Sequence, residues 1–170
     1  MMVATLCTLL CLLTVTYGYT ITPTKVDACP PTGKEVPVEA KLTGSKEDQE
    51  FFMSLDLPFD IDEDFTFTLT IDEWTGLTWH KGLYKFEGTL CEYIPKIIPK
   101  IWDNIRDQIV PKIEDPCIVK ADKYKLEKFT CSTSDISAPV NLYGKFLLTL
   151  KIYTPNEEEV ICRTMEIIGR

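Results

Sequence analysis

The segment Phe65–Ile71 constrains the fold of this chain more than any other part of the sequence. It reads FTFTLTI, so Phe65, Phe67, Leu69 and Ile71 alternate with three threonines. Residues two positions apart lie on the same face of a β-strand, and β-branched and aromatic side chains favour strands. The segment is therefore predicted to be a strand with one apolar face and one polar face.

Six other segments have apolar residues at every second position or a high content of strand-forming residues. They are Glu35–Leu42, Phe51–Leu57, Gly82–Leu90, Lys123–Phe129, Asn141–Tyr153 and Glu159–Ile168. Residues that favour turns lie between several of these segments. They are found at Pro30–Gly33, Gly44–Ser45, Trp74–Gly76 and Thr154–Asn156. Many short strands joined by turns predict an all-β fold, an antiparallel sandwich of two sheets.

One segment breaks this pattern and is predicted to be helical. In Ile94–Val110, apolar residues recur three or four positions apart, which is the spacing of an amphipathic helix. Proline is tolerated in the first turn of a helix but not in its interior, so one short regular helix is predicted at Pro99–Val110, ended by Pro111. Ile94–Ile98 is expected to be an irregular or short helical lead-in. Such a helix either packs on a sheet as part of the core or covers the mouth of a cavity.

The start of the chain has the features of a secretory signal peptide. Val3–Leu13 is almost wholly apolar, and its length suits the core of a signal peptide but is too short to span a bilayer. Thr16 and Gly18 are small residues in the positions that precede a cleavage site. We therefore predict a signal peptide at residues 1–18, a single domain at residues 19–170, and a secreted, extracellular protein. The alternative is a buried N-terminal helix.

The cysteines are consistent with that compartment. Cleavage after residue 18 would leave five of them, at Cys29, Cys91, Cys117, Cys131 and Cys162. In an oxidising compartment these are expected to form disulfides, and an odd number leaves one without an intramolecular partner. Five choices for the odd cysteine and three pairings of the other four leave fifteen arrangements open.

The charge of the chain excludes several classes of partner. The net charge is -8, from 26 acidic and 18 basic residues, and the basic residues form no block. Such a chain has no electrostatic reason to bind nucleic acid or an anionic membrane surface. No segment after the signal peptide approaches the roughly 18 apolar residues of a membrane span, so stable membrane insertion is not expected.

The residue types that carry chemistry form no recognisable site. An acidic cluster lacks the glycine and the final glutamate of an EF-hand loop, and we interpret it as a solvated loop. It consists of Asp60, Asp62, Glu63 and Asp64. His80 is the one histidine, and without a serine-nucleophile motif it is interpreted as a structural or surface residue. With no Cys-x-x-Cys pair and a single histidine, a zinc site is not expected. Because these residues form no catalytic constellation, neither an enzyme nor a cofactor is expected.

Five short motifs, in their order along the chain, resemble a known family. Asp27–Gly33 is similar to the family's opening cysteine segment, and Cys91–Tyr93 to the cysteine that precedes its helix. Cys117–Tyr124 is similar to a cysteine-to-tyrosine segment that leads into a strand. Asn141–Phe146 resembles a glycine-aromatic segment, and Glu159–Cys162 the cysteine of the final strand. With the proline-rich helix and the signal peptide, they resemble the ganglioside-activator-like branch of the ML (lipid-recognition) superfamily, which includes secreted insect proteins.

The chain departs from the family pattern at three places. Ile118 stands where the family often has proline, and Ala121 and Asp122 replace a glycine. Cys131 has no obvious counterpart. The resemblance implies the disulfides Cys29–Cys162 and Cys91–Cys117, with Cys131 left unpaired or pairing between chains.

The resemblance also implies that the two sheets are splayed apart as a cup around an apolar space. The expected lining comes from the inward strand faces and the helix. It comprises Phe65, Phe67, Leu69, Ile71, Ile98, Ile101, Trp102, Ile105, Phe146, Leu148 and Leu150. The expected function is a secreted carrier of a lipid or another small apolar ligand, with a receptor or enzyme as a further partner.

The alternative is that each of these residues belongs to a filled core. The protein would then be a secreted interaction protein, such as a component of venom, saliva or a signalling system. In that case Trp74 or Trp79 would mark its contact surface.

Overall fold

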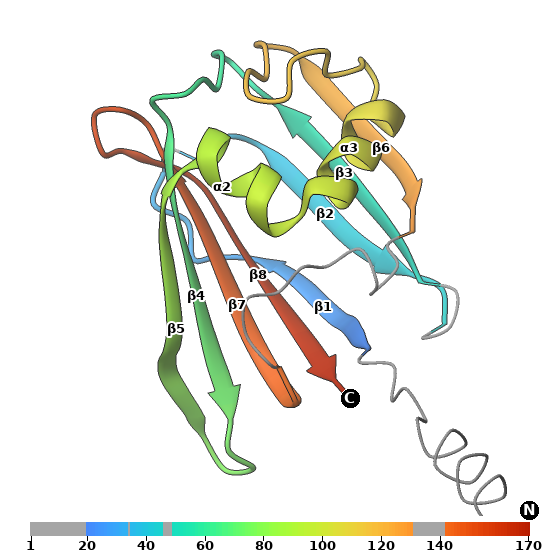
Figure 1. Cartoon of the computed structure of the whole chain (residues 1–170), viewed down its shortest axis with the longest axis vertical. Helices are drawn as coiled ribbons and strands as arrows, with labels where there is room; N and C mark the ends of the chain where they lie inside the picture. Colours follow the sequence, from blue (N-terminus) through green and yellow to red (C-terminus); the bar gives the residue numbers. More distant parts are fainter. Residues whose placement is uncertain (1–19, 34, 46–48, 131–141) are drawn as a thin grey trace, which may run out of the picture.

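Five antiparallel strands form the larger of two sheets, in the order β1-β8-β7-β4-β5 (Figure 1). They are β1 (Ile21–Ala28), β4 (Thr66–Trp74), β5 (Trp79–Thr89), β7 (Gly144–Tyr153) and β8 (Glu159–Gly169).

The structure is a computed structural model that describes residues 20–33, 35–45, 49–130 and 142–170. The predicted signal peptide and Cys131 lie outside the described residues.

Three antiparallel strands form the smaller sheet, in the order β2-β3-β6. They are β2 (Val38–Thr43), β3 (Glu50–Asp56) and β6 (Lys123–Phe129). The all-β, two-sheet fold predicted from residue alternation is therefore confirmed. Each predicted strand segment corresponds to an observed strand, with ends that differ by a few residues.

Strand β1 was not predicted. Its sequence, ITPTKVDA, contains a proline and two charged residues and has no regular alternation. Proline is tolerated in an edge strand, and Pro23 lies at a shift in the register between β1 and β8. Pairing with β8 therefore makes this segment a strand, because its own residues give little local preference for one.

Two helices, α2 (Leu90–Ile97) and α3 (Pro99–Gln108), replace the single expected helix. Pro99 occupies the first turn of α3, as predicted. The lead-in to α3 is helical, which was one of the two expected forms, but this helix begins at Leu90, four residues before the predicted start, and contains Pro95 in its interior. The side chain of Thr89 accepts a hydrogen bond from the Glu92 backbone N–H at 3.4 Å and caps the start of this helix.

The two sheets are joined along one edge by β1 and β2, which approach each other there. The disulfide Cys29–Cys162 ties the end of β1 to β8, and the Val36 N–H donates to the carbonyl oxygen of Val160 at 2.7 Å. On the other edge α2 contacts β5 and α3 contacts β6, so the helix pair connects the sheets (Figure 1). The second disulfide, Cys91–Cys117, fixes α2 to the loop that precedes β6. Both predicted bridges are present.

The buried core consists of two clusters. The larger cluster joins the two sheets beneath the helices and includes Phe67 of β4 and Leu126 of β6. The smaller cluster includes Ile71, Phe146 and Ile167 and belongs to the larger sheet at the end away from the helices. Leu69 and Phe86, which are only partly buried, pack against both clusters and lie between them.

Candidate functional site

The candidate site is the side of the larger sheet that carries Phe67, Leu69 and Ile71, which we call the inner face. Strand alternation places Thr66, Thr68 and Thr70 of β4 on the opposite side. Phe67 belongs to the same buried cluster as Tyr124 and Leu126 of β6, so this side faces the smaller sheet.

Strand register extends the inner face across the sheet in rows. Leu69 pairs with Phe86 of β5 and with Leu150 of β7. The adjacent row pairs Ile71 with Tyr84 and Leu148. Directly opposite residues on one face are close enough for their side chains to touch, so these rows form a continuous apolar surface.

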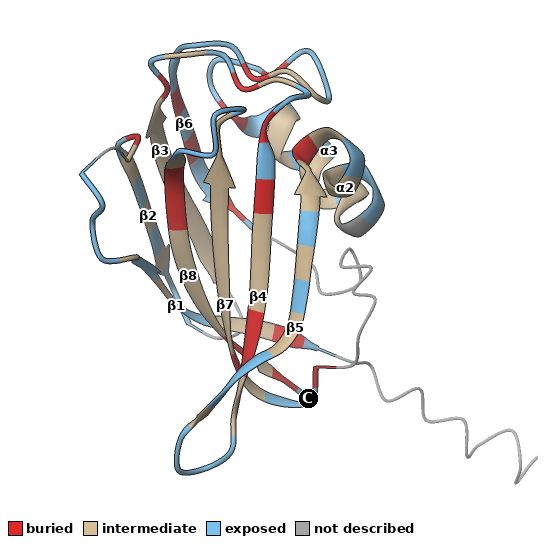
Figure 2. Ribbon diagram, turned by 90° about the vertical axis from the view of Figure 1, so that its left-hand side faces the viewer, coloured by how far each residue is buried: buried red, intermediate tan, exposed pale blue. Residues whose placement is uncertain are grey.

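Burial is uneven along this surface. Phe67 and Ile71 are closed off, with exposed fractions of 5% and 3%. Leu69, which lies between them, is only partly buried, and so are Leu148 and Leu150. Strand β7 is partly buried along most of its length (Figure 2). These residues lie on the central strands of the sheet, where a filled sandwich would bury the inward side chains most completely. Solvent therefore reaches the middle of the inner face.

The helices pack at the Phe67 end of this surface, where the ring of Tyr93 on α2 meets the ring of Phe67 edge-on with centroids 5.4 Å apart. Ile101, Trp102 and Ile105 of α3 pack against the larger cluster, yet no residue of α3 is buried. The indole Nε1 of Trp102 donates to the carbonyl oxygen of Pro116 at 2.8 Å, which holds the ring against the loop after the helix. Ile98, at the junction of α2 and α3, is partly exposed.

The structure divides the predicted lining residues into two groups. Four are buried in the clusters: Phe65, Phe67, Ile71 and Phe146. Seven are partly exposed: Leu69, Ile98, Ile101, Trp102, Ile105, Leu148 and Leu150. Phe65 precedes β4 and stacks on Phe59 with ring centroids 5.8 Å apart, so it belongs to the core beside the site.

Sequence reasoning missed several partly buried apolar residues that extend the surface. On the larger sheet they are Phe86, Ile152 and Met165, and on the facing sheet Met53 and Leu55. Each lies in a predicted strand, so the two-residue period was a signal for them. The same period in β8 places Arg163 in line with Met165 and Ile167, and Arg163 pairs with Leu150. A basic residue therefore ends the apolar row.

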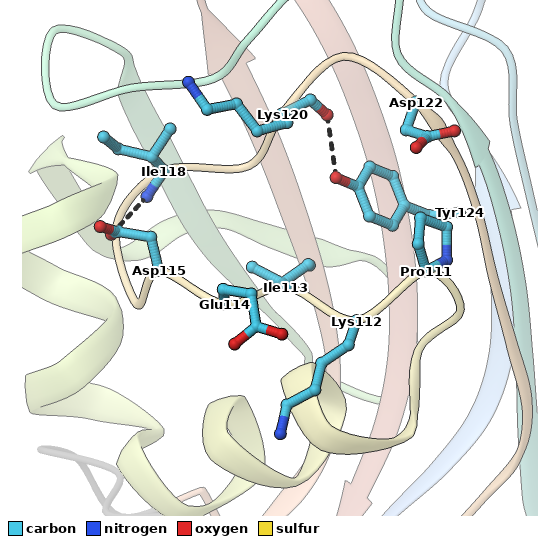
Figure 3. A pocket seen from close by; sticks show the side chains of 9 residues that line it. All are labelled: Pro111, Lys112, Ile113, Glu114, Asp115, Ile118, Lys120, Asp122 and Tyr124. Carbon is cyan, nitrogen blue, oxygen red and sulfur yellow. Dashed lines mark hydrogen bonds between the residues drawn. The ribbon is translucent and has the colours of Figure 1, made fainter.

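A separate pocket of about 270 Å³ lies on the loop between α3 and β6 (Figure 3). It is lined by Pro111, Lys112, Ile113, Glu114, Asp115, Ile118, Lys120, Asp122 and Tyr124. Several of these polar groups are engaged within the protein. Asp115 accepts from the backbone N–H groups of Cys117 and Ile118, and the Tyr124 hydroxyl donates to the Lys120 carbonyl at 3.0 Å. The pocket contains none of the predicted lining residues, and its polar groups stabilise the loop. We therefore do not include it in the candidate site.

The acidic cluster also has a structural partner. Asp60 forms an ion pair with Lys120 at 2.8 Å and accepts from the Ala121 backbone N–H at 2.7 Å. The hydrogen bond from Lys120 lowers the pKa of Asp60. His80 is exposed on β5. Within the described ranges, no group of three or more His, Cys, Asp or Glu residues is arranged to hold a metal ion.

Comparison of the sequence with models of known protein families gives no match, and comparison with curated proteins gives none either. Among the described helices, none is long and apolar enough to cross a membrane. The fold and the uneven burial of its inner face are the features of the described chain that bear on its function.

Proposed function

We propose that this protein is a secreted carrier that holds a lipid or another small apolar molecule between its two sheets. The observation that carries the proposal is the partial exposure of Leu69, Leu148 and Leu150 on central strands, between buried Phe67 and buried Ile71. An apolar surface that stays accessible to water is stabilised when a ligand covers it. An alkyl chain that leaves water gains about 0.8 kcal/mol per methylene group.

Such a protein needs no catalytic group, only an apolar surface with a few polar groups at its edge. The arrangement of the sheets supports this use, because β1 and β2 join them on one side and the helices on the other. The apolar N-terminal segment and the two disulfides support secretion.

The first test is extraction of the purified protein with organic solvent, followed by identification of bound lipids and titration with a fluorescent fatty acid. We expect Leu150→Asn to weaken uptake about 5- to 150-fold, because covering an unpaired amide costs roughly 1–3 kcal/mol. The matched control is Thr149→Asn, which places the same side chain on the outer face of the same strand. Equal uptake by both variants would contradict the proposal.

A second candidate function is a secreted protein that binds another protein through the β4–β5 hairpin. Leu77 at its tip is 90% exposed, and Trp74 and Trp79 form an edge-to-face pair with centroids 5.3 Å apart. Exposed apolar and aromatic groups of this kind are common at protein interfaces. A purified protein that contains no lipid and takes up no fluorescent fatty acid would favour this candidate over the carrier.

A further inference from the structure

The apolar row through the middle of the inner face ends at a positive charge. Strand register aligns Phe86 of β5, Leu69 of β4, Leu150 of β7 and Arg163 of β8. Neighbouring strands lie about 4.8 Å apart, so the row extends roughly 14 Å from the ring to the basic residue. A single alkyl chain placed along this row would have its far end at Phe86 and its near end at Arg163.

The side chain of Arg163 lies between the two sheets. Its Nη2 donates to the carbonyl oxygen of Val38 on β2, which belongs to the facing sheet. Its Nη1 donates to the carbonyl oxygen of Cys162 at 2.5 Å. A guanidinium carries five N–H donors in a planar fork, and these bonds use two of them. The group is thus held in place with donor capacity to spare.

Among the described residues, no carboxylate forms an ion pair with Arg163. Every ion pair within this part of the chain involves a different lysine or arginine. Arg106, by contrast, pairs with Asp103 at 2.8 Å. Glu35 acts on Arg163 only from a distance, since its carboxylate accepts from the backbone N–H groups of Thr32 and Gly33.

Desolvation acts on this cation more strongly than that distant acid. Burial lowers the pKa of Arg163, against the opposite influence of Glu35. A desolvated cation without a hydrogen-bonded counter-ion is costly, and an anion that docks against it recovers the cost. A carboxylate is the best match, because its two oxygens fit the guanidinium fork.

We propose that Arg163 binds the carboxylate head group of a fatty acid whose chain lies along Leu150, Leu69 and Phe86. This inference rests on the proposed carrier function and names the chemical class of its ligand. It assigns Arg163 the role of selecting an acid over a neutral amphiphile of the same length.

The test compares decanoate with decanol by isothermal titration calorimetry on the full mature chain. Wild type is expected to bind decanoate at least about tenfold more tightly, as one hydrogen bond to a charged group would give. Arg163→Gln is expected to abolish that preference, because the affinity for decanoate falls to that for decanol. The matched control Arg106→Gln removes a guanidinium outside the row and is expected to keep the preference.

A second measurement needs no variant, so it stands even if Arg163→Gln fails to fold. With decanoate carrying ¹³C at its carboxyl carbon, the chemical shift of the bound ligand is followed against pH. A carboxylate beside a guanidinium has a lowered pKa, whereas one in an apolar pocket has a raised pKa. A lowered pKa supports the inference, and a raised pKa overturns it.

The outcomes separate the two proposals. Equal affinity of wild type for decanoate and decanol would overturn the role of Arg163 and leave the carrier function standing. Binding of neither compound would overturn the carrier function, and the inference that rests on it would fall as well. A preference for decanoate that persists in folded Arg163→Gln would place the head group elsewhere and overturn the inference.

Discussion

At the scale of single residues, the polar groups that this protein buries hold its turns in place. Asp72 of β4 is the buried polar residue of the described part of the chain, with an exposed fraction of 7%. Its carboxylate accepts from the Gly82 backbone N–H at 2.8 Å and from the Lys81 ammonium at 2.9 Å. The two bonds join β4 to β5 near the tip of their hairpin. The two bonds contribute unequally to stability, because Gly82 lies outside the paired register of β4 and β5 whereas the Lys81 side chain is exposed to water.

This difference predicts unequal effects of two substitutions. Asp72→Ala is expected to lower the free energy of unfolding by about 1–3 kcal/mol, because the Gly82 N–H loses its acceptor. Asp72→Asn keeps an oxygen acceptor and loses only the ion pair with an exposed lysine, at a cost of about 0–1 kcal/mol. Urea unfolding followed by tryptophan fluorescence measures both values. Equal losses in the two variants would contradict the assignment.

At the scale of elements, the end of β5 and the start of α2 are set by one residue. Thr89 is both the last residue of β5 and the N-cap of α2, where its side chain accepts from the Glu92 N–H. The cap turns the chain away from the larger sheet and directs the helix pair towards β6. Without it the first turn of α2 would have one more unpaired N–H group.

Replacement of the cap tests this role. Thr89→Ala is expected to reduce the free energy of unfolding by about 1 kcal/mol, and Thr89→Ser to retain most of it because serine is an equally good N-cap. Chemical denaturation of the two variants provides the comparison. A serine variant as unstable as the alanine variant would show that the threonine methyl group, rather than the hydrogen bond, matters.

The elements also show how far sequence reasoning reached. Period-2 alternation and strand-forming residues identified seven strand segments, because both are local properties of the sequence. It missed β1, whose strand conformation depends on pairing with β8 more than a hundred residues away. It placed the helical start too late, although Thr89 and Glu92 have the spacing of an N-cap and a first-turn acid. The start of the helix could therefore have been predicted from these two neighbouring residues.

At the scale of the whole molecule, the two disulfides close loops of different length. Cys29 and Cys162 are separated by 133 positions and tie the first described strand to the last. Cys91 and Cys117 are separated by 26 positions and hold a helix against a loop. The first bridge therefore restricts nearly the whole unfolded chain, and the second only a small part of it.

Removal of each bridge should reflect this difference. In the chain-entropy model, loss of the long bridge costs about 5 kcal/mol and loss of the short one about 3.5 kcal/mol. We expect the double variant Cys29→Ser with Cys162→Ser to be the less stable of the two double variants in guanidinium unfolding. A larger loss on removal of the Cys91–Cys117 bridge would indicate that the native contacts of α2, rather than chain entropy, dominate.

The sequence by itself determined the strands, their apolar faces and the presence of a helical segment, because side-chain periodicity is carried by neighbouring residues. Only the tertiary structure decided which strands pair and how the two sheets are joined. It alone left Leu69 partly exposed while Phe67 and Ile71, on the same face of the same strand, are buried. It also brought Arg163 into line with Leu150. The reason is that burial and register depend on contacts between residues far apart in the chain, which no local pattern records.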